Sequence, residues 1–70
     1  MPDITEPAVV NINTASAEEL ELLNGVGPET ALAIIEFRET FGGFTSIYEI
    51  REVSGIGDSV FERIRDFITI

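Results

Sequence analysis

The chain contains no cysteine and no histidine among its 70 residues. Without cysteine it cannot form disulfide bonds or thiolate zinc sites, and without histidine it cannot use imidazole metal ligands, Ser/His/Asp catalysis or Cys/His catalysis. The glutamates at positions 18, 19 and 21 are typical of a solvated helix face, not of a catalytic carboxylate pair. We therefore predict a binding module with no catalytic residues, no metal site and no cofactor, rather than an enzyme.

Lysine is absent as well, and the charge is strongly negative. There are 13 acidic residues against four arginines, which gives a formal net charge of −9. DNA-binding domains usually have a basic surface, because displacing the counterions condensed on DNA supplies much of their affinity. Arg38 is the only base in residues 1–50, whereas residues 51–70 carry Arg51, Arg63 and Arg65 against four acids. The second part of the chain is therefore nearly neutral.

Long apolar runs are also missing. No stretch approaches the ~20 apolar residues that a membrane-spanning helix needs, so we expect no membrane segment in this chain. Residues 1–8 hold two prolines and two acids and lack the pattern of a signal peptide, which predicts a flexible N-terminal lead-in. The hydrophobic content of 44% is sufficient for a packed core. We expect one small domain over residues 9–70.

Two short loops have the same pattern, in which two glycines flank one branched apolar residue. They are Asn24-Gly25-Val26-Gly27 and Ser54-Gly55-Ile56-Gly57. Glycine permits a positive φ and lets another molecule approach the backbone, while the residue between the glycines can turn inward as an anchor. The free N–H groups at the start of the helix that follows suit an anion such as phosphate. The simpler alternative is a tight connection between two antiparallel helices.

Helix signals surround both loops. Ser16 with Glu19, and Ser46 with Glu49, have the spacing of a capping box, and Pro28 stands where proline opens a helix. A double glycine at 42–43 is a typical helix stop. We expect an extended arm over 8–13 and helices over 17–23, 28–41, 47–53 and 58–67.

An offset of thirty residues superposes the two halves of this pattern. Caps, apolar positions, glycines and second helices all coincide, as Leu20 with Ile50 and Ile34 with Ile64 illustrate. Neither half alone could bury its apolar face, so the repeat predicts an all-α fold in which two pseudo-two-fold related units share one core. The predicted core residues are Leu20, Leu23, Val26, Ile34, Phe44, Ile50, Val53, Ile56 and Ile64.

With these residues in view, the chain resembles the helix-hairpin-helix domain of ComEA-type competence proteins. The similar positions cover about residues 9–70 and include the run Val10–Leu20, Leu23, Gly25-Val26-Gly27, Ala31, Ile34-Ile35, Phe37-Arg38, Gly43-Phe44 and Gly55-Ile56-Gly57. The resemblance implies a tandem helix-hairpin-helix domain that binds double-stranded DNA without sequence preference during DNA uptake. It also implies that backbone N–H groups hold the phosphates, namely those of Gly25, Val26, Gly27, Gly55, Ile56 and Gly57.

The chain departs from this family at the residues next to the hairpins. Family members usually place a lysine just after each hairpin, where this chain has Thr30 and Ser59. The two hydroxyls can each donate one neutral hydrogen bond, weaker by about half than a charge-assisted one. The second hairpin has the less acidic surroundings, and Arg63 and Arg65 lie in the helix that it opens, so we expect DNA contacts to depend mainly on that hairpin. Alternatively, the arginines only pair with neighbouring acids such as Glu62 and Asp66.

The acids beside the hairpins favour a second interpretation. Glu29 and Asp58 fall in the first turn of a helix, where they stabilise the helix dipole but would repel a phosphate. A small extrinsic subunit of photosystem II with this type of fold docks on protein, so fold alone does not establish DNA binding. The alternative is therefore an acidic helix-hairpin-helix module that has lost DNA binding and serves as a protein-interaction or structural domain.

Overall fold

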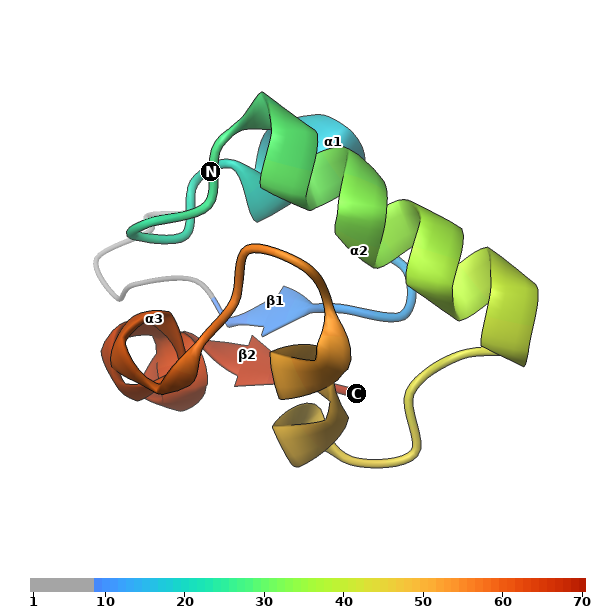
Figure 1. The fold of residues 1–70 in the computed structure, drawn as a ribbon. Helices are drawn as coiled ribbons and strands as arrows, with labels where there is room; N and C mark the ends of the chain where they lie inside the picture. Colours follow the sequence, from blue (N-terminus) through green and yellow to red (C-terminus); the bar gives the residue numbers. More distant parts are fainter. Residues whose placement is uncertain (1–8) are drawn as a thin grey trace, which may run out of the picture.

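A computed structural model describes residues 9–70 of the chain, and helices account for most of its regular structure (Figure 1). The expected lead-in over residues 1–8 lies outside the described residues. The elements, in chain order, are β1 (Val10–Asn11), α1 (Ala17–Leu20), α2 (Pro28–Phe41), the 3-10 helix η1 (Ile47–Glu52), α3 (Asp58–Ile64), the 3-10 helix η2 (Arg65–Phe67) and β2 (Ile68–Thr69). The predicted all-α fold with two helix-hairpin-helix units is confirmed.

A two-residue strand pair joins the beginning and the end of the domain. Val10 lies opposite Ile68 in a parallel register, and the N–H of Ile12 extends the pair by donating to the carbonyl of Thr69 at 2.9 Å. The expected extended arm is therefore a strand, whereas the last helix is shorter than predicted, since residues 65–67 form a 3-10 turn and the chain then extends. Pairing with β1 requires that extension.

One hydrophobic cluster contains residues from both units. Every predicted core residue is buried, and the largest fully buried side chains are Ile12, Leu20, Ile34, Ile50 and Ile64. The cluster also includes residues from the two strands, from the segment between β1 and α1 and from the inner faces of α2 and α3, namely Val10, Ile12, Ala15, Ala31, Phe61 and Ile68. Phe41, which has helical spacing with the core residues of α2, is instead 68% exposed and contacts Phe37.

The first capping box is present at the start of α1. The N–H of Glu19 donates to the Ser16 hydroxyl at 3.2 Å, and the N–H of Ser16 donates to the Glu19 carboxylate at 3.0 Å. The α-helix ends at Leu20 rather than at the predicted residue 23. Tighter turns follow, in which Leu22 and Leu23 each donate to a carbonyl three residues back. These turns bring Leu23 into the core directly before the first hairpin.

The predicted second capping box is wrong in its partners. Ser46 accepts from the N–H of Tyr48 at 3.0 Å, while the Glu49 carboxylate accepts from the N–H and the hydroxyl of Thr45, at 2.9 Å and 2.7 Å. The segment forms a 3-10 helix, whose tighter winding displaces both partners by one residue. The two bonds from Thr45, the backbone one first, lower the pKa of Glu49. Their contribution to stability is present at neutral pH and is lost as acidification protonates this carboxylate.

Two polar side chains hold the segment after β1 against the end of α2 and the loop that follows it. Arg38 donates from Nη1 to the carbonyl of Ile12 at 3.0 Å, and the Asn13 amide both accepts from the N–H of Phe44 and donates to its carbonyl. Gly42 and Gly43, at φ of 80° and 110°, end α2 and turn the chain toward Phe44. Within residues 9–70 no helix combines the length and apolar composition that a membrane crossing requires.

The shared core predicts a clear difference between inner and outer positions. We expect Ile34→Ala and Ile64→Ala each to lower the free energy of unfolding by about 2–5 kcal/mol, because each removes a fully buried side chain and leaves a cavity. The matched control is Leu32→Ala on α2, where the side chain is 56% exposed and the loss should stay below ~0.5 kcal/mol. Urea unfolding followed by circular dichroism measures all three, and equal losses would contradict this core.

Candidate nucleic-acid interface

The two hairpins have almost the same backbone geometry. Gly25 and Gly55, the first glycine of each pair, have φ values of 98° and 99°, a region that favours glycine. Gly27 and Gly57, the second glycines, are the N-caps of α2 and α3 and are extended, with φ of −96° and −93°. Because any residue adopts an extended conformation, the backbone requires glycine only at the first position of each pair.

The residues between the glycines anchor the turns from inside. The side chains of Val26 and Ile56 are buried, as expected. Their N–H groups donate to the carbonyls of Leu23 and Val53, both at 3.0 Å, so these two amides already have partners within the turn. Of the six amides that the resemblance implies, those of the four hairpin glycines form no hydrogen bond with any residue in the range 9–70.

Both helix starts are uncapped and open. Neither Gly27 nor Gly57 can supply a side-chain cap, in contrast to Ser16 at α1, so the first-turn amides of α2 and α3 have no side-chain acceptor. A β-carbon added at either glycine would meet nothing within 4 Å. Another molecule could therefore approach the loop on the side where a β-carbon would point. Residues 9–70 contain no cluster of three or more acidic side chains suited to a metal ion.

Each hairpin packs against the second helix of the other unit. A β-carbon on Gly25 would lie 3.4 Å from a methyl group of Val60 on α3, and one on Gly55 would lie 2.7 Å from the hydroxyl oxygen of Thr30 on α2. Thr30 and Val60 are thirty residues apart, so the two contacts are equivalent in the repeat. The two units therefore contact each other reciprocally, with the glycine loop of each unit packed against the second helix of the other.

The reciprocal contact also explains the place of Thr30. Its side chain is half-buried against Gly55, whereas Ser59 is exposed on the first turn of α3. The thirty-residue offset pairs Ser59 with Glu29, which is exposed at the matching position of α2. Thr30 thus has a packing contact that the sequence alone did not reveal, and Glu29 is the true counterpart of Ser59.

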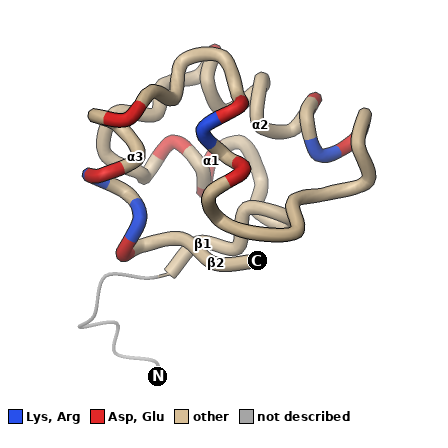
Figure 2. The backbone as a smooth tube through the Cα atoms, turned by 60° about the horizontal axis from the view of Figure 1, so that its bottom comes forward, with Lys and Arg blue, Asp and Glu red and all other residues tan. Residues whose placement is uncertain are grey.

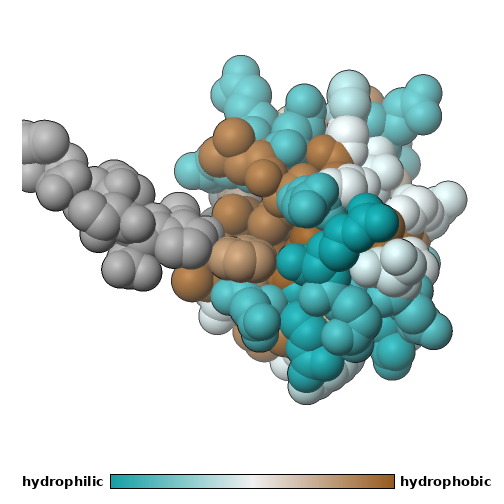
Figure 3. All heavy atoms as spheres, turned by 90° about the vertical axis from the view of Figure 1, so that its left-hand side faces the viewer, coloured by the Kyte–Doolittle hydropathy of each residue, from teal (hydrophilic) through white to brown (hydrophobic). Residues whose placement is uncertain are grey.

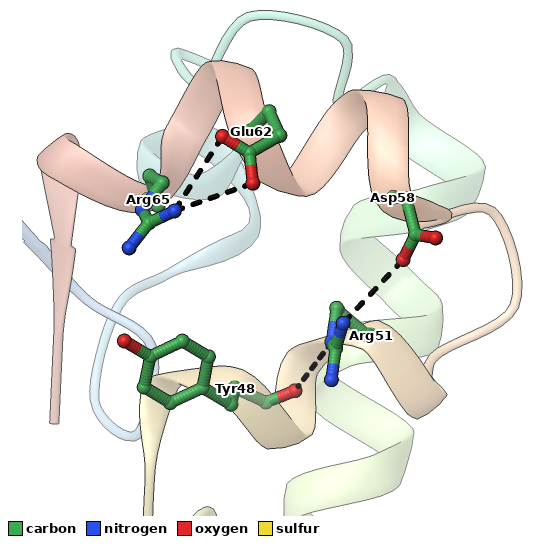
Figure 4. Close-up of polar contacts among 5 residues, drawn as sticks. All are labelled: Tyr48, Arg51, Asp58, Glu62 and Arg65. Carbon is green, nitrogen blue, oxygen red and sulfur yellow. Dashed lines mark hydrogen bonds and ion pairs between the residues drawn. The ribbon is translucent and has the colours of Figure 1, made fainter.

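Arg51 lies beside the second hairpin. Its guanidinium pairs with Asp58, the first residue of α3, at 3.4 Å, and its Nε donates to the carbonyl of Tyr48 at 3.4 Å (Figure 4). The same guanidinium lies 5.5 Å from the ring centroid of Phe61. Exposed pairs of this kind contribute about 0–1 kcal/mol, so Arg51 can exchange Asp58 for another anion at little cost. It also neutralises an acid at the start of the helix.

The remaining α3-side arginines differ in their contacts. Arg65 pairs with Glu62 at 3.2 Å and covers the Phe61 ring, which agrees with the alternative that some arginines only pair with neighbours (Figure 4). Arg63 instead reaches the first hairpin, where its Nη1 would lie 3.4 Å from a β-carbon on Gly25. Position in the sequence places Arg63 beside the second hairpin, whereas in the structure its side chain lies against the first, because α3 packs against that loop.

Acidic residues remain the dominant charge on the surface. They occur on every helix of the described part of the chain, including both 3-10 helices, and the arginines are few and separated (Figure 2). Arg38 is removed from both hairpins by its bond to the Ile12 carbonyl near the end of α2. Within residues 9–70, the arginine beside the second hairpin is Arg51 and the one beside the first is Arg63.

Comparison with known proteins agrees with this geometry. A family model described as a helix-hairpin-helix motif matches residues 6–69. "ComE operon protein 1" of Bacillus subtilis (strain 168) is 54% identical over 63 residues, which cover 90% of this chain and 31% of that protein. An uncharacterized protein of Haemophilus influenzae is 45% identical over 67 residues, covering 89% of this chain and 60% of its own length.

A similar segment occurs in a larger animal protein. The human "Endonuclease/exonuclease/phosphatase family domain-containing protein 1" is 43% identical over 56 residues, which cover 80% of this chain but 10% of that protein. The chain therefore spans about a third, three fifths and a tenth of these three relatives. What it shares with each of them is this small domain.

The close approach at Gly55 generates a stability prediction. Gly25→Ala should lower the free energy of unfolding by about 1–2 kcal/mol, because alanine is strained at a positive φ. Gly55→Ala should cost more, since its methyl group would also lie 2.7 Å from the Thr30 hydroxyl. Adding Thr30→Ala should remove this extra cost, and a double-mutant cycle by thermal unfolding measures the coupling. If Thr30→Ala gives no relief, Gly55 and Thr30 do not pack as described.

Proposed function

Because this chain belongs to the helix-hairpin-helix family, we propose that it binds the phosphate backbone of double-stranded DNA without sequence preference, as a ComEA-type module. The phosphates are held by backbone N–H groups of the two hairpins and of the helix starts that follow them. The resemblance to competence proteins supports extending this proposal to the handling of DNA during uptake. The module itself acts by binding.

The observation that carries the proposal is the second glycine of each hairpin. Gly27 and Gly57 have a backbone conformation open to any residue and no neighbour that a β-carbon would touch. A serine or aspartate there would cap the helix better than glycine does. Packing and conformation therefore do not account for glycine at these two positions. Close approach of a ligand to the amides does, because a hydrogen atom leaves the N–H groups accessible.

The charge distribution determines the character of the binding. At ~0.15 M salt the Debye length is ~8 Å, so acids on distant faces are largely screened at the hairpins. The net charge of −9 then slows association more than it prevents contact. Amide and hydroxyl donors displace fewer counterions than lysines would, so the interaction is weak and less dependent on salt than that of a basic domain.

The alternative function is protein docking, which exposed apolar side chains favour. Figure 3 shows apolar side chains gathered beside hydrophilic ones on one face of the molecule. Among residues 9–70 the large exposed hydrophobic residues are Val9, Leu22, Leu32, Phe41, Tyr48 and Ile70. They are distributed over several elements, whereas the hairpin features coincide in both units, so we place DNA binding first.

Replacing the second glycine of each hairpin with aspartate distinguishes a role of that glycine in binding from a role in folding. Gly27→Asp and Gly57→Asp should leave the free energy of unfolding unchanged or raise it by up to ~1 kcal/mol, because aspartate caps a helix and complements its dipole. The same changes should weaken binding to a short DNA duplex at least tenfold, since the carboxylate competes with phosphate for the amides. Fluorescence anisotropy and thermal unfolding measure the two effects.

Thr40→Asp is the matched control for these variants. It adds the same charge near the far end of α2, about 18 Å along the helix from the hairpin. It should change the affinity less than threefold. Folded Gly27→Asp and Gly57→Asp variants that bind as the original chain does would contradict the DNA proposal and favour protein docking.

Restoring cations at the helix starts should strengthen the interaction. Ser59→Lys should tighten DNA binding and steepen the log–log salt dependence by ~0.9 for one added phosphate contact. Glu29→Lys should do the same at the first hairpin, where Thr30→Lys would disturb the packing against Gly55. The control Glu39→Lys makes the same charge change about 15 Å further along α2 and should leave the slope unchanged. Folded variants without any gain at low salt would show that the hairpins do not meet DNA.

A further inference from the structure

Arg63 is carried by one unit but lies at the hairpin of the other. It projects from α3, which the second hairpin opens, and its Nη1 would lie 3.4 Å from a β-carbon on Gly25 in the first hairpin. Val60, one helical turn earlier on α3, touches the same point from its methyl groups. Two side chains of α3, Val60 and Arg63, thus contact the first hairpin, and Arg63 brings a positive charge to it.

The other three arginines already have partners. Arg38 donates to a backbone carbonyl, Arg51 pairs with Asp58, and Arg65 pairs with Glu62. Arg63 is exposed and forms neither an ion pair nor a hydrogen bond with any residue between 9 and 70. Of the four arginines, it is the one without a hydrogen-bond or ion-pair partner within the described chain.

The first hairpin lacks a cation of its own. Glu21 precedes it, Glu29 follows it, and residues 9–37 contain no basic residue. At the second hairpin, the repeat counterpart of Glu21 is Arg51, which serves that loop from its own unit. The counterpart of Arg63 in the first unit is Ala33, so α2 returns no cation to the second hairpin. Each hairpin therefore has one neighbouring arginine. The second hairpin has Arg51 from its own unit, and the first has Arg63 from the other unit.

We propose that Arg63 completes the first hairpin's phosphate site across the boundary between the units. The amides of the first hairpin and the guanidinium from α3 would hold the same phosphate, so neither unit alone contains a complete first site. This inference rests on the proposed DNA binding. It adds the residue that supplies the positive charge for phosphate binding at the first hairpin, which has acids on both sides in the sequence. It also makes the two units unequal, since the second hairpin receives its arginine locally.

Arg63→Gln tests the contact directly. It should weaken binding to a mixed-sequence DNA duplex about tenfold at ~50 mM salt and reduce the log–log salt slope by ~0.9, because one charged phosphate contact is lost. Arg63→Lys should keep the slope and most of the affinity. The control is Arg65→Gln on the adjacent turn, which should change the affinity less than threefold. Thermal unfolding confirms that each variant is folded.

Two uncharged substitutions, each of which obstructs one hairpin, then show which hairpin Arg63 serves. Gly27→Val and Gly57→Val each add a branched side chain in open space and obstruct one set of amides without introducing a new charge near Arg63. With the first hairpin blocked, Arg63→Gln should cause less than a twofold further loss. With the second hairpin blocked, it should still cause the full tenfold loss.

The outcomes separate this inference from the function on which it rests. A loss on Arg63→Gln that persists with Gly27→Val but disappears with Gly57→Val would assign Arg63 to the second hairpin and overturn the inference. Equal losses in both backgrounds, or no loss in the original chain while Gly27→Val weakens binding, would overturn it as well. If neither valine variant weakens binding, the DNA proposal itself fails.

Discussion

Each hairpin is held by the second helix of the opposite unit, and much of the domain depends on this reciprocal contact. Gly55 approaches Thr30 so closely that a methyl group would collide, and Gly25 rests against Val60. These contacts fix both loops relative to α2 and α3 at once. The fully buried Ile34 and Ile64 lie on those helices, at equivalent positions of the repeat. The short strand pair then closes the domain by joining residues 10–11 to 68–69.

The two glycines of a hairpin have different physical roles. The first has a positive φ and, at Gly55, a close neighbour, so the fold requires it. The second has an extended backbone and open space beside it, so the fold does not. A glycine that folding does not require, repeated at the uncapped start of two helices, leaves amides exposed to an incoming anion. This division is the basis for treating the loops as a phosphate-binding surface and not only as tight connections.

The charges near each hairpin matter more to it than the net charge of the whole chain. A net charge of −9 describes the whole chain, but a hairpin responds to groups within about a Debye length. There the local balance includes Arg51 beside Asp58 at one loop and Arg63 against Gly25 at the other. Arg38 and Arg65, by contrast, support the fold or pair with a neighbour. For the proposed DNA binding, the positions of the four arginines therefore matter more than the total charge.

The sequence by itself determined the helical class, the duplication, the buried face of each helix and the hairpin positions. These follow from local rules, since apolar spacing, a capping serine such as Ser16 and glycines flanking Val26 act over a few residues. Only the tertiary structure decided the partners of the second cap, the strand pair, the packing of Thr30 and the reach of Arg63 across the units. Each of these depends on how helices distant in sequence approach one another, and the thirty-residue pattern specifies that two units meet without specifying which side chains touch.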